Sequence, residues 1–151
     1  MPFGLPLVRL LAAVLAAVVP TLRAEITRAA GPSAELVTLQ VHLRPTDLVL
    51  GSYQGSLRWK PGSLSIVSVS APGKDGTRMF NAADSAKGIV RFAGFSTSGF
   101  TGTDALTLVV KPVRPLERAG LTVAVDVAGD LAGKAVPKDR LIPARGVRGG
   151  Q

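Results

Sequence analysis

The feature that most constrains this chain is an alternation of apolar and polar residues that repeats between prolines and glycines. Val37, Leu39, Val41 and Leu43 alternate with polar residues until Pro45, the pattern of a strand with one buried and one wet face. The same pattern returns in residues 53–59, 64–69, 89–95, 105–110 and 121–127. Beyond the N-terminal region, no stretch keeps a helical period. The sequence therefore predicts an all-β domain.

Turn residues separate these segments and set the number of strands. The chain has 17 glycines and 11 prolines in 151 residues, and they favour tight turns. Residues 78–81 and a weaker run at 131–136 complete the set. The spacing predicts an antiparallel β-sandwich of jelly-roll type with about seven to nine strands. A closed barrel is the competing geometry, because periodicity does not separate the two.

The N-terminal region is typical of a signal peptide. Residues 10–19 form an apolar run that is too short to span a bilayer, and Leu22-Arg23-Ala24 resembles a cleavage site. We expect cleavage after Ala24, with Ala29 as the second candidate; a buried helix is the rival interpretation. The predicted organisation is a signal peptide (1–24), a linker (25–34), the sandwich (35–137) and a basic, disordered tail (138–151). The mature chain is expected to be secreted, extracellular or periplasmic, without a membrane span.

Positive charge gathers near the C-terminus. The chain has 18 Lys and Arg against 10 Asp and Glu. Residues 134–151 contain five of these cations but only one acid, Asp139. This segment has no aromatic residue for base stacking, so no nucleic-acid partner is expected. The tail is expected to be solvated, either without a partner or in weak contact with an anionic surface.

Few residues are suited to chemistry. Cysteine is absent and His42 is the single histidine, which excludes thiol nucleophiles, disulfides and thiolate metal sites. His42 is expected on the wet face of its strand. Asp126 and Asp130 could form a glycosidase-like carboxylate pair, but solvated loop positions explain them better. Residues 94–99 do not match a nucleophile elbow. We expect a non-catalytic protein with no cofactor and no metal site.

Three segments resemble a known family. They are the opening strand 36–43, the hairpin GSYQGSLRWKPGSLSIVSV at 51–69, and residues 87–92 leading through a Gly-rich loop to 105–110. Their order is similar to that of a cohesin-type domain, the jelly-roll module of cellulosome scaffolds, over about residues 35–136. The likeness is a pattern of hydrophobic positions without a catalytic signature.

The resemblance implies a docking function. Cohesin-type domains bind a calcium-loaded dockerin on one sheet face, whose strands would correspond here to 53–59, 78–81, 89–95 and 121–127. By alternation, the side chains that point outward there are Gln54, Ser56, Arg58, Arg91, Thr122 and Asp126. We expect a secreted module that docks a dockerin-bearing protein in an extracellular, polysaccharide-related assembly. An ordinary solvated sheet face is the alternative for these six positions.

Two other functions stay open. A carbohydrate-binding module would contact polysaccharide directly through exposed aromatic rings. However, Trp59 is expected in the core with Leu57, and Phe100 is the one aromatic residue expected to be exposed. A cell-surface structural subunit that assembles through its edge strands is the third class.

Overall fold

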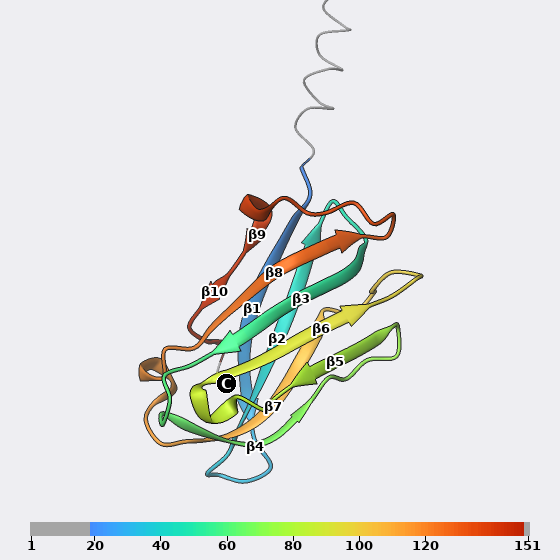
Figure 1. Cartoon of the computed structure of the whole chain (residues 1–151). Helices are drawn as coiled ribbons and strands as arrows, with labels where there is room; N and C mark the ends of the chain where they lie inside the picture. Colours follow the sequence, from blue (N-terminus) through green and yellow to red (C-terminus); the bar gives the residue numbers. More distant parts are fainter. Residues whose placement is uncertain (1–18, 150–151) are drawn as a thin grey trace, which may run out of the picture.

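The computed structural model describes residues 19–149 and contains two β-sheets packed face to face (Figure 1). The first sheet has the strand order β11-β1-β2-β7-β4, with β9 also paired to β1. The second sheet has the order β10-β8-β3-β6-β5. The strands are β1 (Thr21–Ala30), β2 (Val37–Thr46), β3 (Leu50–Arg58), β4 (Leu64–Ser70), β5 (Thr77–Asn81), β6 (Ile89–Phe95), β7 (Asp104–Pro112), β8 (Thr122–Asp130), β9 (Leu141–Ile142), β10 (Ala144–Arg145) and β11 (Arg148–Gly149).

The long strands follow the alternation of the sequence, and their apolar faces meet between the sheets. Leu39 and Val41 of β2 are fully buried, as are Leu57 of β3 and Val123 of β8. Each such side chain contributes about 1.5–3 kcal/mol by leaving water. Trp59, directly after β3, is 5% exposed, which confirms the prediction that it belongs to the core. The sandwich geometry is also confirmed, because the two sheets keep separate strand orders. The expected number of seven to nine strands is too low, because residues 19–149 contain eleven, and the weaker run at 131–136 forms none of them.

The N-terminal boundary differs from the prediction. The second half of β1 occupies residues 25–30 of the predicted linker, and β1 pairs with β2 from Thr21↔Thr46 to Ala30↔Val37. Leu22, Ala24 and Ile26 are buried, an alternation that the adjacent apolar run obscured. Cleavage after Ala24 or Ala29 would fall inside β1. Residues 1–18 of the predicted signal peptide lie outside the described residues, and no helix within residues 19–149 could cross a membrane.

The prediction of a disordered C-terminal tail is wrong for residues 138–149. After the 3-10 helix η3 (Lys138–Arg140), β9 and β11 pair with β1 while β10 pairs with β8. The segment therefore joins the two sheets along one edge (Figure 1). Val136 is buried and Leu141, Ala144 and Val147 pack against the core. These apolar residues are spaced too irregularly to have indicated strands.

The loop 96–103 also differs from the prediction, because Phe100 is buried. Its ring lies 5.2 Å from that of Tyr53, and the guanidinium carbon of Arg78 lies 4.7 Å from its centroid. Asp75 ties the loop down by accepting hydrogen bonds from the backbone N–H groups of Thr101 (2.7 Å) and Gly102 (3.0 Å). These bonds and the Arg78 guanidinium hold the pKa of Asp75 well below its usual range.

Candidate docking face

The outer face of the second sheet, here called the docking face, gathers the six predicted site residues. In the register of β3, Gln54 lies opposite Ala93 and Val127, and Ser56 lies opposite Arg91 and Ala124. Arg58 lies opposite Thr122. Asp126 is on β8, next to Val127. The four expected strands are thus neighbours in one sheet, in the order β8-β3-β6-β5 (Figure 1).

A shallow groove of about 290 Å³ crosses this face. Five of the six predicted residues line it, all except Thr122, together with residues of β5 that include Met79 and Asn81. Ser56 points outward as predicted but is buried between its two neighbouring strands. The small side chains of Ser56 and Ala93 leave room above the sheet, so the groove can accept protruding side chains of a partner.

Three apolar side chains on or beside the docking face were not predicted as site residues. Phe95 and Val127 are each 57% exposed and Met79 is 54% exposed. Phe95 lies opposite Thr77, two positions along β5 from Met79, so alternation could have identified both. Val127 could not have been found that way, because the register of β8 shifts opposite Gln54 and Gly55 and leaves both Asp126 and Val127 exposed.

The charged residues of the docking face differ in whether they form ion pairs. Arg91 Nη1 lies 2.8 Å from Asp84 Oδ2, and Lys87 Nζ lies 3.9 Å from the other oxygen of that carboxylate. These two cations lower the pKa of Asp84. Within residues 19–149, Arg58 forms no ion pair. The two arginines are therefore not an equivalent pair, and Arg58 is the cation more available to an acidic partner.

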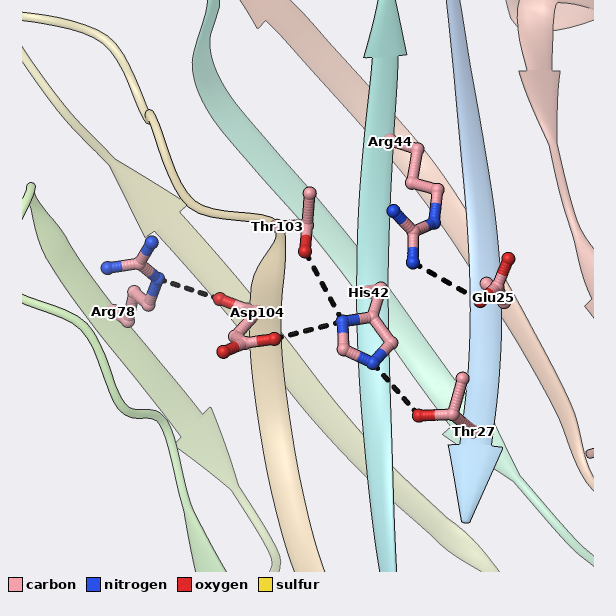
Figure 2. Close-up of polar contacts among 7 residues, drawn as sticks. All are labelled: Glu25, Thr27, His42, Arg44, Arg78, Thr103 and Asp104. Carbon is pink, nitrogen blue, oxygen red and sulfur yellow. Dashed lines mark hydrogen bonds and ion pairs between the residues drawn. The ribbon is translucent and has the colours of Figure 1, made fainter. Parts of the chain in front are cut away.

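His42 lies at the centre of a polar network on the outer face of the first sheet (Figure 2). Its Nδ1 is 2.9 Å from Asp104 Oδ1 and its Nε2 is 2.9 Å from Thr27 Oγ1. Arg78 Nε donates to the Asp104 carbonyl oxygen at 3.0 Å, which connects the network to β5. Alternation placed His42 on the correct face, but the expected wet position is wrong because its neighbours leave the side chain only 12% exposed.

The hydroxyl, imidazole and carboxylate of this network follow the order of a nucleophile, a base and an orienting acid. However, catalysis also needs a pocket for the substrate and donors for a developing oxyanion. The imidazole is held between Thr27 of β1 and Asp104 of β7, which leave it 12% exposed. The network therefore joins the neighbouring strands β1, β2 and β7 through side-chain hydrogen bonds and stabilises their pairing.

The carboxylate pair considered for Asp126 and Asp130 is not assembled. Asp130 Oδ1 accepts backbone hydrogen bonds from Ala132 (3.0 Å) and Lys134 (2.8 Å). These bonds hold the turn after β8, whereas Asp126 lines the groove of the docking face. The two residues therefore serve different parts of the structure.

Comparison with known proteins places the fold. No family model and no curated protein matches the sequence. A cohesin module from a Clostridium perfringens family 33 glycoside hydrolase superposes with a TM-score of 0.60 at 10% identity, covering 85% of this chain and 97% of that one. A type I cohesin–dockerin complex from Clostridium thermocellum gives 0.58 at 10% identity over 85% and 99%.

A third similar structure is a non-cellulosomal cohesin from Archaeoglobus fulgidus, with a TM-score of 0.55 at 11% identity over 84% of this chain and 92% of that one. The described chain is thus a β-sandwich with the cohesin fold. The likeness spans most of the chain and nearly all of each cohesin, so it concerns the whole domain rather than a shared hairpin.

Proposed function

We propose that this protein is a non-catalytic docking module that binds a protein partner on its docking face. The observation that carries the proposal is the exposure of three apolar side chains on one sheet face. Met79 lines the groove together with Arg58 and Arg91, and Phe95 and Val127 are exposed elsewhere on the same face. Exposed apolar side chains rimmed by polar residues are characteristic of interaction sites. Arginine and aromatic residues often dominate the binding energy of such sites.

The partner that fits is a dockerin-like module with an acidic contact surface. The solved cohesin from Clostridium thermocellum is in complex with a dockerin, and one from Acetivibrio cellulolyticus is in complex with a Cel5 dockerin. Among residues 19–149, the guanidinium group of Arg58 has no ion-pair partner. An acidic partner would be steered toward it and would associate faster than a neutral one.

The setting we propose is extracellular or periplasmic, in a polysaccharide-related assembly. The apolar run at residues 10–19 supports export. Direct polysaccharide binding is less well supported as the main function. Phe95 lies on the docking face, whereas Phe80 lies opposite Phe92 on the other face of β5 and β6. The two exposed rings therefore do not form one flat platform.

The experiment is a binding screen against calcium-loaded dockerin modules, with the full chain immobilised. A photo-crosslinking residue at position 95 should capture a bound dockerin, and the same residue at Val67 on β4 should not. Val67 is a suitable control because it is equally exposed but belongs to the other sheet. Crosslinking at Val67 alone would show that the partner binds elsewhere.

A further inference from the structure

The edge of the sandwich where the C-terminal segment packs on β1 concentrates positive charge. Arg23, Arg145, Arg148 and Glu25 line a cleft of about 160 Å³ between β1 and residues 143–148. Arg44 lies opposite Arg23 in the register of β1 and β2 and also reaches Glu25 (Figure 2). This cleft is called the edge cleft below, and with Arg44 beside it the edge carries five charged groups.

The positive charge of the edge cleft is not balanced. Glu25 is the one carboxylate among the five groups, with Arg44 Nη2 at 3.4 Å from one oxygen and Arg148 Nη1 at 3.9 Å from the other. Within the described part of the chain, Arg23 and Arg145 have no ion-pair partner. Like charges on facing strand positions repel, so an added anion would lower the electrostatic energy of this edge.

We propose that the edge cleft binds the carboxylate groups of an acidic polysaccharide. The guanidinium group presents a planar fork of donors that matches a carboxylate, and Arg145 and Arg148 are both exposed. A cleft of about 160 Å³ accommodates one carboxylate with its attached carbons rather than a whole sugar ring. The polymer would therefore run along the edge and insert one uronate group at a time.

The surroundings of the cleft favour a polysaccharide over a membrane. Surfaces that lie on a bilayer combine cations with exposed apolar side chains. The large apolar residues that are exposed in this structure are Val49, Val67, Met79, Phe80, Phe95, Val113, Val127 and Leu131, and none of them lines the edge cleft. Its lining residues also include no aromatic ring on which a nucleic-acid base could stack.

The edge cleft is separate from the docking face. The groove of the docking face is lined by residues of β3, β5, β6 and β8, whereas the cleft is lined by residues of β1 and the C-terminal segment. A bound partner and a bound polymer would thus not compete. This inference goes beyond the proposed docking function and does not rest on it.

The test is affinity electrophoresis of the full chain in native gels that contain polygalacturonate, with neutral dextran as the blank. The parent protein should be retarded, and Arg145→Gln with Arg148→Gln should weaken binding by more than about tenfold, because both donor forks that pair with a carboxylate are lost. Arg58→Gln with Arg91→Gln removes the same net charge from the docking face and should retain parental binding. Arg145 and Arg148 remain in the chain whether a signal peptide is cleaved after Ala24 or after Ala29.

Arg145→Lys with Arg148→Lys separates recognition from folding, because it retains the charges that surround Glu25 but loses the donor fork. It should melt like the parent and bind less tightly. Three results would overturn the proposal: no retardation of the parent, equal losses in both Gln pairs, or binding to phosphatidylglycerol vesicles without binding to polygalacturonate. Dockerin binding, measured on the same proteins, should respond only to the Arg58 and Arg91 pair.

Discussion

Arg91 Nη1 lies 2.8 Å from Asp84 Oδ2, at the end of the docking face where η1 (Ser85–Lys87) precedes β6. This ion pair orients the guanidinium group of Arg91 and partly compensates its positive charge. Arg58, opposite Ile89 on the neighbouring strand, has no such partner among the described residues. The two arginines should therefore contribute differently to docking.

Charge reversal tests this difference. Arg58→Glu should weaken binding of an acidic partner more than Arg91→Glu, and the double variant should lose more than about tenfold in affinity. The melting temperature should hardly change in Arg58→Glu, because exposed strand positions tolerate substitution, and should fall slightly in Arg91→Glu, which loses the ion pair with Asp84. Titration calorimetry against a calcium-loaded dockerin measures the affinities, with Lys111→Glu on β7 of the other sheet as the control. Equal effects of the two single variants would contradict the role given to Asp84.

The exposed apolar side chains should contribute to docking and not to folding. Met79→Ala with Phe95→Ala should reduce affinity by at least about 2 kcal/mol, the loss that defines a hot-spot residue in an interface. Urea denaturation should give nearly the parental stability, since both side chains are more than half exposed. Val67→Ala is the matched control in β4. An unchanged affinity would remove these residues from the proposed interface.

Trp59 should be a structural residue. Trp59→Ala should lower the free energy of unfolding by about 3–5 kcal/mol, because it leaves a cavity where a 5% exposed ring packs. Chemical denaturation followed by circular dichroism measures the loss. Phe95→Ala, at an exposed ring, should change stability by less than about 1 kcal/mol. A stable Trp59→Ala protein would show that the indole ring is not part of the core.

Asp75 should make the stability depend on pH at the acidic end. Its pKa is lower in the folded chain than in the unfolded chain, so its contribution is present above the unfolded pKa of about 3.9 and is lost as the pH falls through the folded value. Asp75→Asn should lower the melting temperature at neutral pH and flatten its decline below about pH 4. The control is Asp139→Asn, at an exposed residue of η3. Parallel melting curves against pH for all three proteins would contradict the assigned role.

The first half of β1 should stabilise the sandwich. A protein that begins at Glu25 lacks Leu22 and Arg23, which pair with β9, and it also loses the buried side chain of Leu22. It should be at least about 2–5 kcal/mol less stable than one that begins at Val19, the range for loss of a buried leucine. Denaturation of the two proteins tests this expectation. The mass of the exported product tests separately whether cleavage occurs after Ala24.

Local pattern was sufficient for part of this structure. Alternation in residues 37–43 and 53–59 depends only on the two-residue period of a strand, and it correctly placed Leu39, Leu57 and Trp59 inside and Gln54, Arg58 and Arg91 outside. The resemblance to cohesin-type domains supplied the four strands of the face, and alternation then selected the six residues, which the structure places on one sheet.

Interactions between distant segments decided the rest. Phe100 is buried because Asp75, which is 25 residues away, holds the loop 96–103 over Tyr53. Residues 141–142 and 148–149 form strands because they pair with β1, more than a hundred residues earlier. In both cases backbone groups form hydrogen bonds with residues that are far away in the sequence. These partners come close only after the sheets have formed, so the local residue pattern does not predict them. For the same reason, Arg23 and Arg145 are separate basic residues in the sequence, and only the folded edge places them around one carboxylate.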